Sequence, residues 1–157
     1  MSLVTDRKDL DPSIDPVTGQ QRTYLVLSEE ERAKGFIRPV RTTYQHVGRR
    51  PKYPLRDLTE KERGYNDGQP AEQHFVKFEE YPEGSPERAR KATGRFWSQA
   101  ELNSGCGSTT SMGQVLAETY ARDPNFYGGT FCSKCGAHFP VGADGEFVWL
   151  DGSRVGT

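Results

Sequence analysis

Thr130-Phe-Cys-Ser-Lys-Cys-Gly-Ala-His138 is the stretch of sequence that decides the fold. Two thiolates three positions apart, here Cys132 and Cys135, can bind one Zn²⁺ when the chain turns tightly between two strands. Gly136 can adopt a positive φ, which lets the following amides point at the sulfurs. A redox-active C-x-x-C pair would open a helix in a βαβ unit, and no such unit is predicted around it. The sequence therefore predicts a zinc knuckle.

Cys106 is the predicted third ligand, because it is followed by Gly107 and so repeats the Cys-Gly ending of the knuckle. The position three residues before it is Asn103, a poor ligand for zinc. The fourth ligand is expected among the three histidines, where His138 and His46 are equal candidates and His74 or water is the remaining alternative. His138 completes a Cys-x2-Cys-x2-His spacing, whereas His46 would meet Cys106 if residues 47–105 loop out.

Three thiolates and one imidazole would close a tetrahedral site, which is typical of structural rather than catalytic zinc. With all three cysteines bound to metal, no thiol remains as a nucleophile. The chain also lacks H-E-x-x-H, a Walker lysine, a G-x-S-x-G elbow and the deaminase signature. We therefore predict no catalytic residue and no organic cofactor, and expect a protein that is not an enzyme.

Leu, Ile, Val and Phe make up about 18% of the 157 residues, which is a low content for a folded chain. The net charge of −1 and the aromatic content of 11% nevertheless argue against disorder. A chain so poor in apolar residues needs a metal, disulfides or a partner surface to fold. Three cysteines are an odd number, so the composition favours the metal.

The predicted fold class is α+β and rich in β-structure: a small zinc-ribbon-like antiparallel sheet with one capped helix. A stripe from Met112 to Tyr120, after Ser111, predicts that helix. Strands are expected at 36–44, 126–131, 137–141 and 146–150, the last two joined as a hairpin through 143–145.

Around this domain, formed by residues 24–46 and 106–157, two appendages are expected. Residues 1–23 follow neither a helical nor a strand period and are interpreted as an extended arm. Residues 47–105 are charged and proline-rich, with one strand at 74–78, and are interpreted as a long irregular insertion. A capping box at Ser28 predicts a short helix that Gly35 ends.

Apolar runs reach only four residues, so we expect no membrane span. The N-terminus carries charged residues at Asp6 to Asp9 where the apolar stretch of a signal peptide would begin. The expected location is a reducing compartment, namely the cytoplasm of a host cell, or a virion. A basic run interleaved with tyrosines is typical of a nucleic-acid surface, although acidic residues elsewhere balance it. It consists of Arg38, Arg41, Arg49, Arg50, Lys52 and Arg56.

The segment Thr130–His138 resembles the second zinc knuckle of Mss4-like proteins, which include formaldehyde-activating and methionine-R-sulfoxide reductase relatives. That resemblance implies a β-rich zinc fold. It departs at the first knuckle, where those families have a second C-x-x-C and this chain has Cys106 alone. Because the resemblance is confined to this short segment, it transfers no activity.

Residues 36–46 and 106–157 resemble uncharacterised small phage-encoded proteins, through segments such as Thr110-Ser-Met-Gly113 and Leu116–Pro124. This resemblance implies a viral source. We therefore expect a zinc-binding, non-enzymatic interaction protein, either a virion component or a binder of a host protein, with a protein partner or larger assembly. The alternatives are a nucleic-acid-binding zinc ribbon and an Mss4-like zinc enzyme.

Overall fold

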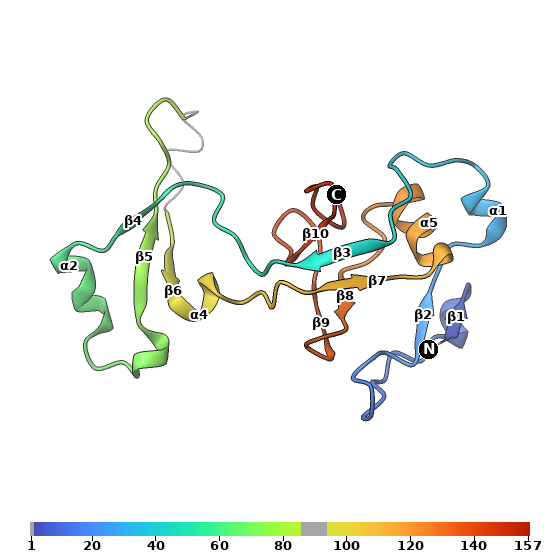
Figure 1. Ribbon diagram of the computed structural model, residues 1–157, viewed down its shortest axis with the longest axis horizontal. Helices are drawn as coiled ribbons and strands as arrows, with labels where there is room; N and C mark the ends of the chain where they lie inside the picture. Colours follow the sequence, from blue (N-terminus) through green and yellow to red (C-terminus); the bar gives the residue numbers. More distant parts are fainter. Residues whose placement is uncertain (1, 86–93) are drawn as a thin grey trace. The chain divides into compact units, whose positions relative to one another are not determined.

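A computed structural model describes residues 2–85 and 94–157 of the chain. The chain divides into two compact units: unit 1 comprises Met1–Val47 and Gly105–Thr157, and unit 2 comprises Gly48–Ser104. Unit 2 is the mostly green part of the ribbon in Figure 1. The fold class is α+β, as expected, with short and mostly antiparallel sheets. No helix in the described ranges is long and apolar enough to cross a membrane.

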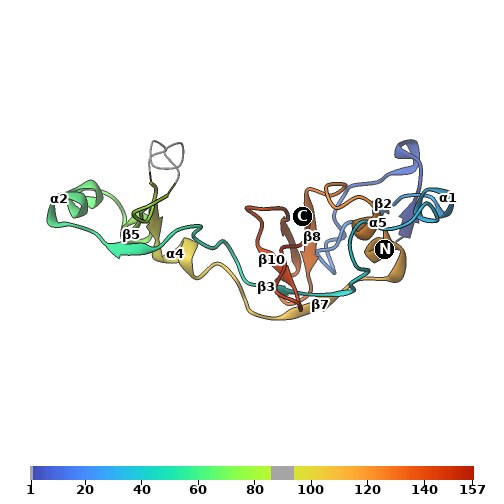
Figure 2. The ribbon, with the colours of Figure 1, turned by 90° about the horizontal axis from the view of Figure 1, so that it is seen from above.

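The central sheet of unit 1 has the order β10-β3-β7 and is antiparallel throughout. Its strands, which lie side by side in Figures 1 and 2, are β3 (Thr43–His46), β7 (Thr109–Ser111) and β10 (Phe147–Trp149). The register places His46 opposite Phe147 and Tyr44 opposite Trp149. Tyr44 makes edge-to-face contacts with both of these aromatic partners of β10, and all three rings are buried. The sheet therefore brings three segments that are distant in the sequence into one core.

The strand predicted at residues 36–44 is wrong in extent, because only its last two residues are in a strand. The observed strand β3 starts at Thr43 and lies in the centre of its sheet. The amides of Ile37 and Arg38 instead donate to the carbonyl of Ala121, at 2.9 and 3.1 Å. Ala121 lies in the last turn of helix α5 (Gln114–Arg122), whose final carbonyls have no partner within the helix. This segment thus caps a helix rather than extending a sheet.

Helix α5 confirms the predicted apolar stripe but starts later than its pattern indicated. Ser111 pairs with Thr43 as the last residue of β7, so it is not available as a helix cap. Gly113 takes the N-cap position, and Met112 precedes the helix. The buried positions of α5 are Leu116, Ala117, Thr119, Tyr120 and Ala121.

Strands β8 (Gly129–Cys132) and β9 (Ala137–Pro140) form the hairpin expected around the knuckle. The turn between them is closed by a 2.9 Å bond from the Gly136 amide to the Cys132 carbonyl, with Gly136 at a φ of 65°. A positive φ here is readily adopted only by glycine, so this residue shapes the turn. The predicted hairpin between the last two strands is wrong, because β9 pairs with β8 whereas β10 pairs with β3.

Residues 1–23, expected as an extended arm, belong to unit 1. Strand β1 (Ser2–Val4) pairs in parallel with β2 (Thr23–Leu25), and a short 3-10 turn, η1 (Arg7–Asp9), follows β1. Near the knuckle the arm approaches so closely that a Cβ built on Gly19 would lie 1.9 Å from the carbonyl oxygen of Gly136. The predicted helix after Ser28 is confirmed as α1 (Glu29–Arg32), with the Ser28 hydroxyl accepting from the Glu31 amide.

Unit 2 is not the irregular insertion that its proline content predicted. It contains an antiparallel sheet of order β4-β5-β6 and several short helices. Its elements are β4 (Leu55–Asp57), α2 (Glu60–Arg63), η2 (Gly64–Asn66), η3 (Ala71–Gln73), β5 (Phe75–Glu79), β6 (Phe96–Ser98) and α4 (Gln99–Leu102). The strand expected at 74–78 corresponds to β5. Its neighbours are three residues long, too short to show a period in the sequence. Residues 86–93 of the expected insertion lie outside the described residues.

Candidate metal centre

Four side chains from unit 1 converge at one point: His46, Cys106, Cys132 and Cys135. Each offers one ligand atom, and these atoms all lie within 4.8 Å of one another. His46 is the last residue of β3, and Cys132 is the last residue of β8. A donor set of one imidazole and three thiols so close together is compatible with a metal site.

His46 and Cys106 are held together by backbone pairing just beyond the central sheet. The amide of Gly107 donates to the His46 carbonyl at 2.8 Å, and the His46 amide donates to the Ser108 carbonyl at 3.0 Å. Gly107 has a φ of 76°, which turns the chain between Cys106 and β7. His46 and Cys106, which are 60 positions apart in the sequence, are thus brought together, as the His46 alternative required.

Two of the distances between donor atoms are close to those of tetrahedral coordination. The Cys106 and Cys132 sulfurs are 3.5 Å apart, and Cys135 Sγ lies 3.6 Å from His46 Nδ1. With Zn–S of about 2.3 Å and Zn–N of about 2.0 Å, a tetrahedron separates two sulfurs by about 3.8 Å and a sulfur from a nitrogen by about 3.6 Å. These two distances are therefore compatible with a metal site.

The imidazole of His46 has a defined orientation. Its ring is 1% exposed and stacks between Phe139 and Phe147, with centroid distances of 4.5 and 4.8 Å. Its Nε2 lies 3.0 Å from Oε1 of the buried Glu146. With a metal ion on Nδ1, Nε2–H would donate to this carboxylate, the arrangement that commonly orients metal-ligating histidines.

The thiols influence one another's ionisation. Desolvation opposes ionisation of Cys106, but hydrogen bonds from the Ser108 amide, from His46 and from the other two thiols lower its pKa to about 6. Desolvation raises the pKa of Cys135 to about 12, and the neighbouring Cys132 and Cys106 add to the rise. One thiolate forms readily and makes the next harder to form. A bound dication stabilises all the thiolates together.

His138, the other predicted candidate, does not join the group. Its Nε2 lies 2.6 Å from the hydroxyl oxygen of Tyr24, and burial lowers its pKa. Side chains alternate along β9, and the adjacent Phe139 is the residue that stacks on His46. His138 therefore projects to the opposite face. The remaining histidine, His74, lies in unit 2, where its Nε2 is 2.9 Å from the Gln69 carbonyl.

Glu146 is the site residue that sequence reasoning missed. It stands directly before the apolar run of β10, where burial of a carboxylate requires a partner. The position of this acidic residue next to an apolar run was the available sign that its carboxylate is buried. The sequence did not show that His46 would be its partner.

The basic run forms ion pairs within the protein at two of its arginines. Arg41 contacts Asp151 at 3.1 Å and lies over the Trp149 ring, with its Cζ 4.9 Å from the ring centroid. Arg56 bonds Glu62 and also Glu80. Arg41 belongs to unit 1 and Arg56 to unit 2, so the run is divided between them.

Comparison of the chain with protein-family models, with curated proteins and with solved structures gives no match.

Proposed function

We propose that the protein is a non-enzymatic interaction protein whose unit 1 is stabilised by one Zn²⁺ ion in a zinc-ribbon-like sheet. The observation that carries the proposal is the convergence of His46, Cys106, Cys132 and Cys135 within 4.8 Å. Thiolate-rich sets with one imidazole favour Zn²⁺ among the common divalent ions, because zinc accepts soft ligands and a tetrahedral geometry. When bound, the ion would cross-link the end of β3, the segment before β7 and the β8–β9 hairpin.

The donor set supports a structural role more than a catalytic one. Catalytic zinc sites use three protein ligands and keep one position for water or substrate, whereas four protein ligands leave none. All three cysteines of the chain stand in the group, so none is left over as a thiol nucleophile. This argument favours an interaction protein over the Mss4-like enzyme alternative.

Exposed apolar side chains of unit 1 support a protein partner. Ile37 is 59% exposed, Leu150 is 68% exposed and Val17 is 90% exposed. The ion pairs of Arg41 and Arg56 weaken the nucleic-acid alternative, because these guanidinium groups already contact carboxylates. A phage source, and a place in a virion or in host cytoplasm, rest on the sequence resemblance and remain predictions.

Metal analysis with X-ray absorption at the zinc edge tests the proposal. Wild type should hold one zinc per chain with three sulfur neighbours and one nitrogen neighbour. His46→Ala should lose the nitrogen and most of the bound metal, whereas His138→Ala should retain the full set. Zinc with fewer than three sulfur neighbours, or full occupancy in His46→Ala with loss in His138→Ala, would overturn it.

Because His46→Ala can fail to fold, Glu146→Gln serves as a milder variant. It keeps the size of the side chain and removes the charge that orients the His46 Nε2–H. Loss of such a carboxylate costs about 10- to 100-fold in metal affinity, which competition with a chromogenic chelator measures. Glu118→Gln is the matched control, since Glu118 also contacts a basic side chain in unit 1, that of Arg32. An unchanged affinity in Glu146→Gln would contradict the orientation of His46.

A further inference from the structure

A cavity of about 350 Å³ in unit 1 contains none of the four metal ligands. Its walls come from the N-terminal segment with η1 and β2, from the loop after α5, and from strands β8 and β9. Its volume lies in the range of about 300–1,000 Å³ that is usual for small-molecule sites.

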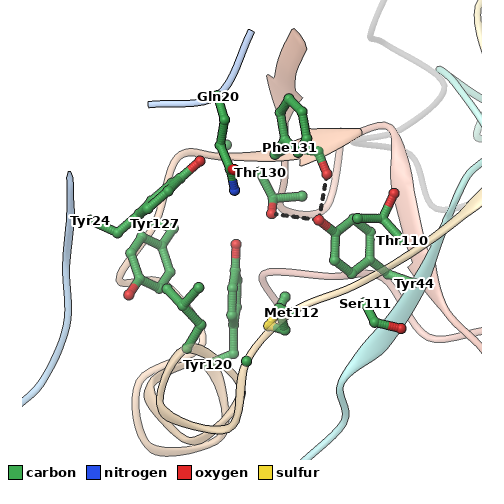
Figure 3. A pocket seen from close by; sticks show the side chains of 13 residues that line it. Gln20, Tyr24, Tyr44, Thr110, Ser111, Met112, Tyr120, Tyr127, Thr130 and Phe131 are labelled. Atoms are coloured by element: carbon green, nitrogen blue, oxygen red, sulfur yellow. Dashed lines mark hydrogen bonds between the residues drawn. The ribbon is translucent and has the colours of Figure 1, made fainter. Parts of the chain in front are cut away.

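Two tyrosines of this wall, Tyr24 and Tyr127, also line a neighbouring cavity of about 80 Å³ (Figure 3). A cavity of about 150 Å³ holds benzene, so the smaller cavity has no room for a ring. By the same comparison, the larger cavity has room for a ligand of about 12 non-hydrogen atoms, twice the size of benzene. The larger cavity is therefore the candidate for an organic ligand.

Apolar side chains provide much of the wall of the larger cavity. They are Leu10, Ile14, Leu25 and Phe126, and none of them is fully buried. Ile14 is exposed, so this part of the wall meets solvent. Covering such a surface with the apolar part of a ligand is favourable.

Arg7 is the only side chain charged at neutral pH among the described residues that line the cavity. No aspartate, glutamate or lysine lines it, and burial lowers the pKa of His138, its only histidine. The Arg7 guanidinium makes no ion pair or hydrogen bond within residues 2–85 and 94–157, whereas the adjacent Lys8 pairs with Asp6. The wall therefore presents one positive charge without a counter-charge.

The tyrosine and histidine side chains of the wall already have partners. Tyr24 Oη lies 2.6 Å from His138 Nε2, and Tyr127 Oη donates to the Leu25 carbonyl at 2.6 Å. These bonds tie β2 to β9 and to the loop after α5, so they define the shape of the wall. They leave Arg7 as the charged group that can recognise a ligand.

We propose that this cavity binds a small organic carboxylate, with the apolar part of the ligand against the apolar wall and its carboxylate on Arg7. A guanidinium suits a carboxylate because the two groups can form parallel hydrogen bonds. A phosphate monoester would bring a second negative charge, for which no further cation lines the wall in the described part of the chain. An uncharged ligand would leave Arg7 without a counter-charge.

Titration of the full chain in zinc-containing buffer with 2-naphthoate, followed by amide NMR shifts, tests the proposal. Shifts should concentrate at residues 24–25 and 126–129, which line the cavity. The uncharged 2-naphthamide, of the same size, should bind about fivefold more weakly at low salt, since Arg7 is exposed. High salt should reduce that difference. Acetate, which lacks the rings, should bind about 100-fold more weakly than 2-naphthoate.

Three results of this titration would overturn the proposal. One is equal affinity for 2-naphthoate and 2-naphthamide at low salt. Another is a set of shifts confined to residues that do not line the cavity. The third is tighter binding of 2-naphthyl phosphate than of 2-naphthoate, because it would assign the site to a dianion.

The role of Arg7 is tested by Arg7→Gln, which should abolish the preference for 2-naphthoate over 2-naphthamide. Lys8→Gln is the matched control: it makes the same change in net charge at the next residue, which does not line the cavity. It should keep the preference. A preference that survives in Arg7→Gln would contradict the assigned ion pair.

The role of the apolar wall is tested by Ile14→Ser, which should weaken 2-naphthoate and 2-naphthamide equally, by about fivefold. Val17→Ser is its control, since Val17 is exposed in the same segment and does not line the cavity. Unchanged affinities in Ile14→Ser would contradict the assigned wall. Failure of every probe to bind would overturn the inference, whereas the zinc content of the same samples tests the metal proposal separately.

Discussion

Units 1 and 2 differ in how they satisfy their clustered polar groups. In unit 1, three thiols and the buried His46 converge on one another, and only the Nε2 side of the imidazole has a carboxylate partner. In unit 2, the buried carboxylate of Glu79 accepts from the Lys52 and Tyr53 amides at 2.7 and 2.9 Å and from Trp97 Nε1 at 3.1 Å.

At Glu79, unit 2 supplies the hydrogen-bond donors for its own buried carboxylate, whereas unit 1 presents donor atoms suited to an ion. Glu79 is surrounded by N–H donors, so unit 2 needs no external group at that position. Thiolates pressed together repel one another unless a cation lies between them. Metal should therefore be required by unit 1 and irrelevant to unit 2.

Removal of the metal should produce the largest difference in stability between the two units. Structural zinc contributes about 10–16 kcal/mol of apparent binding free energy, which is comparable to the whole stability of a domain. Chelation, or Cys132→Ala, should therefore remove hydrogen-exchange protection throughout unit 1 and leave that of unit 2. Lys134→Ala, in the same turn, is the control and should behave as wild type. Simultaneous loss of protection in both units would refute the comparison.

Truncation of Trp97 should have the opposite effect: it should destabilise unit 2 and leave unit 1 unchanged. This ring is 3% exposed, lies under the guanidinium of Arg95 and donates to Glu79. Trp97→Ala should destabilise unit 2 by about 3–5 kcal/mol. Trp97→Phe, which keeps a ring but loses the bond to Glu79, should cost about 1–2 kcal/mol. Urea titration followed by amide hydrogen exchange measures the loss of stability in each variant. The zinc content of both variants should stay unchanged. A drop in zinc content would show that the units are not independent.

The smallest effect is expected at an ion pair of unit 2. Hydrogen bonds from the Arg56 side chain and from the Thr59 backbone lower the pKa of Glu62 to about 2, from an ordinary 4.5. Since the folded pKa is depressed, the stabilisation is present above pH 4.5 and is lost as pH falls through about 2. Glu62→Gln should therefore weaken unit 2 slightly at neutral pH, and its difference from wild type should vanish towards pH 2.

Glu60→Gln is the control for that titration, because Glu60 lies in the same helix and is not among the carboxylates that Arg56 contacts in the described part of the chain. Denaturation midpoints of the three proteins across pH 2 to 7 give the comparison. If Glu62→Gln and Glu60→Gln follow the same curve, the ion pair contributes nothing.

The sequence predicted those parts of the fold that depend on residues close together in the chain. The knuckle turn depends on Cys132, Cys135 and Gly136 within five residues, and the sequence identified it. The apolar stripe of α5 was visible for the same reason. Its start was misplaced, since pairing of Ser111 with Thr43, 68 residues away, decides where β7 ends.

The sequence by itself determined that the last third of the chain would turn tightly at Cys132–Gly136, because the spacing of a C-x-x-C-G motif is a local property. Only the tertiary structure decided between His46 and His138, since strand alternation in β9 and pairing of β3 with β10 determine which ring faces the thiols. The tertiary structure also supplied Glu146 as a neighbour of His46, and the sheet of unit 2. Each of these depends on contacts between residues distant in the chain, which short-range periodicity does not encode.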